Sequence, residues 1–184
     1  MTLHGAWSSS TSFNHISSQI SASWQHFDYD HRTEGMRQII HRARDSITRP
    51  CLLIGHSLGG IVALSLEDHP LVRGIITLAS PLTGLDLNLI QVYLSRSGLI
   101  AEITNRSHII KDIHRHQFTK PVLHLIANRG YNPFIYEHND GVLPYAVQTG
   151  WACGDMREIA ANHYEILQSQ DTLRQIDDFI QNIG

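Results

Sequence analysis

The stretch that decides the fold reads Cys51-Leu52-Leu53-Ile54-Gly55-His56-Ser57-Leu58-Gly59-Gly60. Its apolar first half predicts a short buried strand, and the Gly-x-Ser-x-Gly pentapeptide predicts a sharp turn into a helix. The helix that follows is apolar on nearly every side up to Leu66, which is typical of a buried helix. A turn of this kind can lift a serine hydroxyl out of a sheet, so Ser57 is a candidate nucleophile. The alternative is an ordinary strand–turn–helix with an incidental serine.

Predicted strands and helices alternate along the rest of the chain, which indicates an α/β fold with a largely parallel sheet. The strand at 23–29 is polar, which favours a position at the edge of the sheet. We expect residues 1–184 to form a single domain with a minimal sheet of about six strands flanked by helices. The other strands are expected at 1–3, 51–54, 74–79, 121–127 and 156–160, and further helices at 12–20, 33–47 and 171–183.

The long segment 81–120 separates the predicted strands at 74–79 and 121–127. We expect it to hold two helices, at 85–95 and 104–117, and insertions of this length between core strands are often functional. We interpret it as a candidate helical cap that supplies an apolar pocket over Ser57. A crossover helix with extra length is the alternative. The candidate substrate-binding residues are Trp7 and, within the cap, Leu87, Ile90 and Leu94.

A serine nucleophile needs a neighbouring base and a carboxylate that orients the base. His163 directly follows the last predicted strand, at the edge where open parallel sheets place their active sites. Asp140 heads an Asn-Asp-Gly turn after the strand at 121–127. Asp155 is the rival acid, but it precedes the last strand and is therefore expected at the opposite edge. His124 is a weaker candidate base than His163 because it lies within a strand.

The same chemistry needs N–H donors for the negatively charged oxygen of a tetrahedral intermediate. One donor is expected from Leu58, the residue after the serine, at the start of its helix. The other is expected from Ala6, because Gly5 lets the chain turn sharply after the first strand. These two backbone N–H groups form the predicted oxyanion hole.

Together, these motifs resemble the α/β-hydrolase family, and within it the lipase and esterase branch. The matching segments are His4-Gly5, the pentapeptide around Ser57, Leu78-Ala79-Ser80-Pro81, Asn139-Asp140-Gly141-Val142 and Asn162-His163. The order of serine, acid and base along the chain is also that of the family. The chain departs from the family in starting inside the strand that ends in His-Gly, which two strands usually precede.

The resemblance implies a serine hydrolase that cleaves a carboxylic ester through an acyl-enzyme on Ser57. The aromatic residues Trp7, Phe134 and Tyr136, with the apolar cap, favour a short or medium acyl chain and a carboxylesterase. A lipase comes next, because an interfacial lipase would expose more apolar surface. A thioesterase or acyltransferase with the same three residues is an alternative, and a catalytically silent binding protein is another.

Composition excludes several other classes of protein. The net charge of −3 does not suit nucleic acid or an anionic membrane, and two cysteines are too few for a disulfide framework. The sequence has neither a signal-peptide pattern nor a transmembrane run, so we expect a cytoplasmic protein. No cofactor or metal is expected, since the spacing of His114 and His116 does not place them on one helix face. The oligomeric state is left open.

Overall fold

The computed structural model describes residues 1–86 and 102–183, and it confirms a parallel α/β fold. Six strands form one sheet in the order β2-β1-β3-β4-β5-β6, and every neighbouring pair is parallel. The polar segment at 23–29 does form the edge strand, although only His26–Phe27 pair. The strands are β1 (Thr2–Leu3), β2 (His26–Phe27), β3 (Cys51–His56), β4 (Val72–Leu78), β5 (Val122–Ala127) and β6 (Asp155–Ile159).

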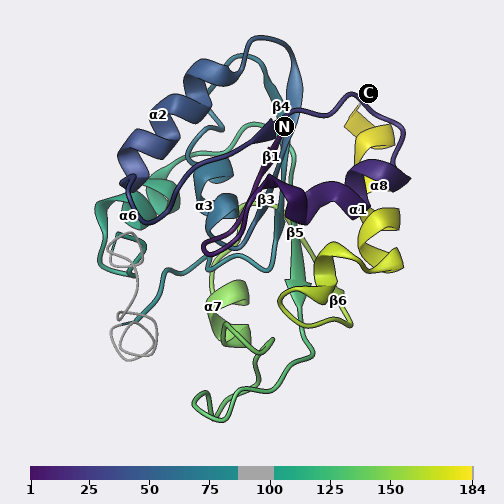
Figure 1. Ribbon diagram of the computed structural model, residues 1–184. Helices are drawn as coiled ribbons and strands as arrows, with labels where there is room; N and C mark the ends of the chain where they lie inside the picture. The colour runs from purple at the N-terminus through teal and green to yellow at the C-terminus, as the bar shows by residue number, and fades with distance from the viewer. Residues whose placement is uncertain (87–101, 184) are drawn as a thin grey trace.

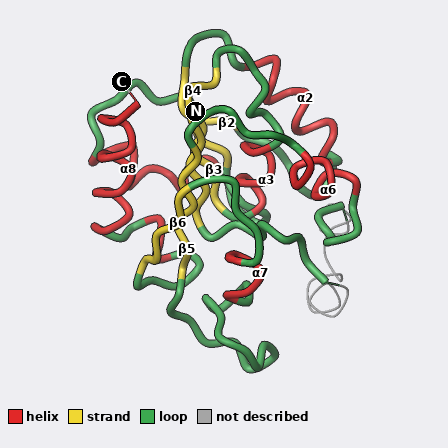
Figure 2. The backbone as a smooth tube through the Cα atoms, turned by 180° about the vertical axis from the view of Figure 1, so that it is seen from behind, coloured by secondary structure: helices red, strands yellow, loops and turns green. Residues whose placement is uncertain are grey.

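Helices cover both faces of this sheet, as Figures 1 and 2 show from opposite sides. Helices α2, α3 and α6 lie on one face, and α1 and α8 lie on the other. The helical elements are η1 (Ser10–Phe13, a 3-10 helix), α1 (Asn14–Gln19), α2 (Met36–Ser46), α3 (Leu58–Leu64), α6 (His108–Arg115), α7 (Tyr145–Thr149), η2 (Glu165–Leu167, a 3-10 helix) and α8 (Gln170–Ile183). No helix in the described ranges combines the length and apolarity needed to cross a bilayer.

The central strands are buried on both faces, which explains their nearly continuous apolar sequences. Successive side chains of a strand point to opposite faces of the sheet. Leu53 of β3 therefore packs with the helices α2 and α3, whereas its neighbour Ile54 packs with Phe13 and Ile176 from the α1 and α8 side. Two hydrophobic clusters result, one on each face, and they hold the sheet between its helices.

Two predicted helices differ in detail from the structure. The helix expected from residue 33 begins at Met36, and its N-cap residue is Gly35. Thr33, the first residue of the expected helix, instead lies in a turn where its N–H donates to Asp30 O at 3.1 Å. The helix expected at 12–20 is divided into η1 and α1.

The segment 81–120 is described only in part. Its second predicted helix is α6, which begins four residues later than expected and buries Ile110 and Ile113. These side chains join the cluster that contains Met36 of α2, so α6 is a crossover helix on the sheet face. The predicted pocket residues Leu87, Ile90 and Leu94, with most of the helix expected at 85–95, lie outside the described residues.

A buried carboxylate ties the segment after α3 to the turn that enters β5. Glu67 is only 2% exposed and accepts hydrogen bonds from His116 Nε2 at 2.6 Å, from Thr119 N at 2.8 Å and from Lys120 N at 2.8 Å. Burial by itself would raise its pKa, but these hydrogen bonds prevail and lower the pKa of Glu67 to about 2. The carboxylate therefore stabilises the fold in its charged form.

Replacing Glu67 with glutamine should lower the free energy of unfolding at neutral pH by about 3 kcal/mol. Because the pKa of Glu67 is depressed in the folded state, its contribution is complete above its ordinary value of 4.5 and disappears as the pH falls towards about 2. Urea unfolding of both proteins across this range measures the difference. Asp45→Asn on the exposed face of α2 is the control and should change little; a constant gap between wild type and Glu67→Gln at all pH values would contradict the prediction.

Candidate active site

Ser57 occupies a strained turn between β3 and α3. Its backbone has φ +52° and ψ −120°, a conformation rarely adopted by a residue with a side chain. The turn is possible because two glycines allow the backbone segments to meet. A Cβ at Gly55 would lie 2.3 Å from Gly59 O, and one at Gly59 would lie 2.0 Å from Leu3 O. Tight packing of α3 against β1 and β3 thus holds the serine at the carboxyl end of β3.

His163 and Asp140 form a buried hydrogen-bonded pair. His163 Nδ1 lies 2.6 Å from Asp140 Oδ2, and their side chains are 3% and 0% exposed. The other carboxylate oxygen, Oδ1, accepts hydrogen bonds from the backbone N–H groups of Val142 at 2.8 Å and Leu143 at 2.6 Å. These two N–H donors hold the carboxylate of Asp140 in one orientation. The arrangement leaves Nε2 of His163 as the ring atom available for proton transfer.

Gln148 is a third member of this cluster, which the sequence analysis missed. Its side chain is fully buried, and Nε2 donates to Asp140 Oδ2 and to Ala127 O, both at 3.1 Å. The N–H of Ala127 donates to Oε1 at 3.1 Å, and this bond fixes which end of the amide faces Asp140. Gln148 therefore clamps Asp140 to the end of β5. No local pattern marks this glutamine, since the five-residue helix α7 that carries it has no motif.

His56 links the serine turn to the His163 loop. Its Nε2 lies 2.8 Å from His163 O, and because a carbonyl can only accept, this ring nitrogen carries the proton. The ring is 2% exposed and also packs against the His163 ring, with centroids 4.9 Å apart. Burial, with the nearby His163, lowers the pKa of His56 to about 3. His56 is therefore neutral at physiological pH and acts as a fixed donor between the two loops.

Ser57 and His163 line one cleft, together with three other residues singled out in the sequence. These are Ala6, Trp7 and Leu58. The cavity measures about 30 Å³, and its remaining walls are Pro81, Leu85, Ile103, Val142, Leu143 and Tyr164. No hydrogen bond among the described residues engages the backbone N–H of Ala6 or of Leu58. The cleft thus combines a serine, an imidazole and two available N–H groups with mostly apolar walls.

Other residues considered in the sequence lie away from this cleft. Asp155 begins β6, opposite Leu123, and is therefore at the other edge of the sheet. His124 is fully buried within β5, where Nδ1 lies 2.8 Å from Thr77 Oγ1, and burial lowers the pKa of His124 to about 4. Neither residue is among those that line the cleft with Ser57.

The remaining aromatic and histidine candidates also have other surroundings. Phe134 and Tyr136 do not line the cleft; both are exposed on the loop between β5 and α7. His114 Nε2 lies 2.8 Å from Leu82 O, and His116 pairs with Glu67. Within residues 1–86 and 102–183, no group of histidine, cysteine and acidic side chains is arranged to hold a metal ion.

Comparison with known proteins gives one family match. The model of a PGAP1-like alpha/beta domain matches residues 33–114, which is less than half of the chain but includes the Ser57 turn. No curated protein sequence matches this chain.

Solved structures match almost the whole chain. A mature lipase from Bacillus licheniformis aligns with a TM-score of 0.70 at 16% identity, covering 100% of this chain and 90% of the lipase. A monoacylglycerol lipase from Paleococcus ferrophilus aligns with a TM-score of 0.66 at 13% identity, covering 100% and 93% of the two chains. An alpha/beta superfamily hydrolase from Oenococcus oeni aligns with a TM-score of 0.67 at 13% identity, covering 99% of this chain and 91% of that hydrolase. At these identities the likeness is one of fold.

Proposed function

From the α/β-hydrolase fold of this chain, we propose that it is a serine hydrolase that cleaves a carboxylic ester, with Ser57 as nucleophile. The observation that carries the proposal is the meeting of the strained Ser57 turn and the buried His163–Asp140 pair in one cleft. Strain at a turn costs free energy, and a fold retains it where it serves a function. The lipases and hydrolases among the structural relatives favour the same class of reaction.

In the proposed mechanism, Ser57 Oγ attacks the ester carbonyl carbon while His163 Nε2 takes the hydroxyl proton. The carbonyl oxygen becomes negatively charged and is held by the N–H groups of Leu58 and Ala6. Asp140 accepts a hydrogen bond from the Nδ1–H group of His163. This bond fixes the tautomer of His163 and stabilises the imidazolium. His163 then protonates the departing alcohol, leaving an acyl group on Ser57. Water activated by the same histidine hydrolyses this acyl-enzyme and restores both residues.

The expected substrate follows from the cleft. Its described walls are apolar, and the volume of about 30 Å³ favours a short acyl chain, and hence a carboxylesterase. Leu85 and Ile103, at the two ends of the segment that is not described, both line it. The proposal therefore includes a cap over Ser57 within the segment 81–120, formed by the part that precedes α6, with Leu87, Ile90 and Leu94 as substrate-binding residues. A cytoplasmic location is a separate part of the proposal.

The proposal predicts that a fluorophosphonate probe adds once to the wild-type protein and not to Ser57→Ala. The reason is that only an activated serine attacks this phosphorus centre. Intact-mass measurement detects the adduct, and Ser80→Ala, which changes another serine near α3, is the control that should still be labelled. Wild-type protein that has not been exposed to the probe should hydrolyse p-nitrophenyl acetate faster than esters of longer acids.

Two outcomes would replace the proposal. A folded wild-type protein that takes up no probe would favour a catalytically silent binding protein. If the wild-type protein reacts with the probe but, without it, transfers acyl groups to added alcohols or thiols in preference to water, it would be an acyltransferase; competing acceptors and product analysis would reveal this.

A further inference from the structure

The large hydrophobic residues that the described chain exposes gather at one edge of the sheet. Trp7 follows β1, Tyr164 follows β6, and the other three lie on the loop between β5 and α7. Because all the strands are parallel, these three connections leave the same, carboxyl edge, which also carries Ser57. The exposed fractions are 44% for Trp7, 58% for Tyr164, 84% for Tyr131, 73% for Phe134 and 100% for Tyr136. We call these five residues the aromatic rim.

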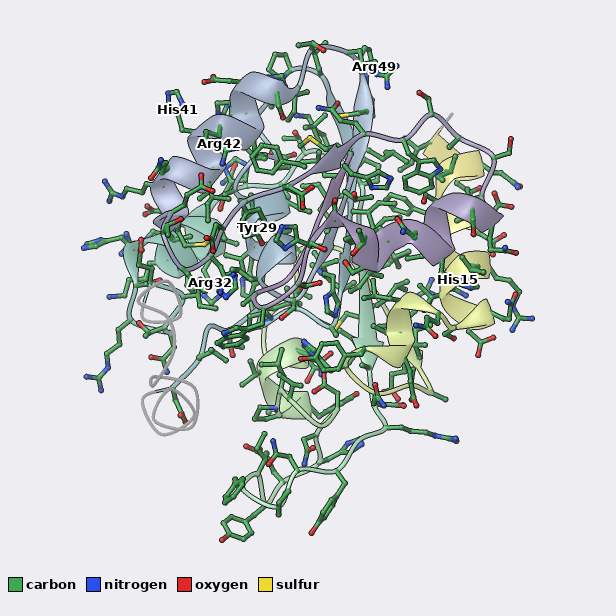
Figure 3. All side chains as sticks on the ribbon, viewed as in Figure 1. His15, Tyr29, Arg32, His41, Arg42 and Arg49 are labelled. Carbon is green, nitrogen blue, oxygen red and sulfur yellow. The ribbon has the colours of Figure 1, made fainter. Side chains whose placement is uncertain are left out.

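The loop that carries most of the rim is a folded unit. Asn132 Nδ2 donates to Gly141 O at 3.1 Å, and Asn139 Nδ2 donates to Ile135 O at 3.1 Å and Glu137 O at 2.8 Å. His138 Nε2 donates to Asn128 O at 2.6 Å, which closes the base of the loop. Figure 3 shows this loop, below α7 in that view, with side chains that extend away from the sheet. Its aromatic side chains are therefore presented outward by a braced backbone.

Neighbouring side chains of this loop point in different directions. Ile135 turns inward and is 6% exposed, whereas Phe134 and Tyr136 on either side of it turn outward. Ile135 thus fixes the loop to the rest of the fold, and the two larger rings stay in water. Exposing large apolar rings to water costs free energy unless another surface covers them. Three large rings exposed on one short loop make this loop a candidate site of interaction.

We propose that the aromatic rim docks this protein on a neutral lipid surface, with the cleft facing the lipid. Tyrosine and phenylalanine suit the boundary between headgroups and acyl chains, since their rings are apolar and the tyrosine hydroxyl stays hydrated. Between Asn128 and His138 the loop carries one cation, Arg129, and one anion, Glu137, so its charge favours neither anionic nor cationic lipid. Trp7 and Tyr164 belong to the rim and also line the cleft, so the rim includes part of the entrance to Ser57. The inference extends the proposed function, because it says where the ester is presented.

The test is flotation of the whole protein with phosphatidylcholine vesicles. Wild type should float with the vesicles, and the triple variant Tyr131→Ser, Phe134→Ser and Tyr136→Ser should lose at least about tenfold in partitioning, because three rings no longer enter the lipid. The matched control, Arg129→Ser with Glu137→Ser, should float like wild type. Brominated lipid should quench the tryptophan fluorescence of wild type by a larger fraction than that of Trp7→Phe, which keeps only Trp24 and Trp151.

The binding measurement does not depend on turnover, so it separates this inference from the proposed function. The triple variant should react with fluorophosphonate at the wild-type rate, since these three residues lie outside the cleft. Equal flotation of wild type and triple variant would overturn the inference. So would binding to anionic vesicles alone that salt abolishes, or a dimer that the triple variant loses, because the rim would then serve another partner.

Discussion

Replacing His163 with alanine is expected to lower kcat/KM for p-nitrophenyl acetate by about 10⁴-fold or more. Without the imidazole, the proton of Ser57 has no acceptor and the departing alkoxide has no donor. The variant should still fold, because Asp140 keeps its hydrogen bonds from Val142, Leu143 and Gln148. Initial-rate kinetics on protein checked by circular dichroism measures the effect.

The control for this experiment is His41→Ala. His41 lies on α2 at the surface of the molecule (Figure 3) and pairs with the exposed Asp45 at 3.0 Å. It is not among the residues that line the cleft. It should retain wild-type kcat/KM. If His163→Ala kept a tenth or more of the activity, another group would have to be the base, and the assignment of His163 would be wrong.

Replacing Gly59 with alanine should lower the free energy of unfolding by about 3 kcal/mol or more, or prevent folding. The new Cβ would lie 2.0 Å from Leu3 O and 2.6 Å from His4 O. Both are backbone atoms of the β1 segment, so no change of side-chain conformation relieves the clash. The helix α3 would have to move away from the sheet, and the Ser57 turn would move with it.

Urea unfolding measures this loss, and fluorophosphonate labelling of the fraction that still folds measures the displacement of Ser57. The control is Gly35→Ala, where a Cβ would approach only the flexible end of Glu102, at 3.3 Å from Oε1. That variant should change stability by no more than about 1 kcal/mol. A Gly59→Ala protein as stable as wild type would show that α3 and β1 do not pack as closely as the structure has them.

Much of the fold follows from local sequence patterns. Buried parallel strands need continuous apolar runs, and such runs marked the strands around Ile54 and Ile76. Helix boundaries were less predictable, because the position of a cap depends on backbone geometry. The helix expected from Thr33 begins only at Met36, after the N-cap residue Gly35. The position of α6 beside α2 could not be predicted from the sequence of α6. An apolar stripe shows that one face of a helix is buried, but not which element packs against that face.

The candidate site divides in the same way. Ser57, Asp140 and His163 each carry a local signal: a glycine-bounded serine, an Asn-Asp-Gly turn and a histidine directly after the last strand. Gln148 and His56 carry none, because their importance comes from contacts with residues distant in sequence. In the sequence, the aromatic residues Phe134 and Tyr136 favour a short or medium acyl chain, but the structure places them on the outer surface and outside the cleft.

The sequence by itself determined the alternation of strands and helices, the tight Ser57 turn and the order of the three polar residues along the chain. These depend on side-chain periodicity and on glycine at positions where backbones must meet, and both are properties of neighbouring residues. Only the tertiary structure decided which side chains brace Asp140 and His163, and which aromatic rings turn outward. Those outcomes depend on how β1, β5, β6 and α7 pack together, and packing between distant segments leaves no local pattern.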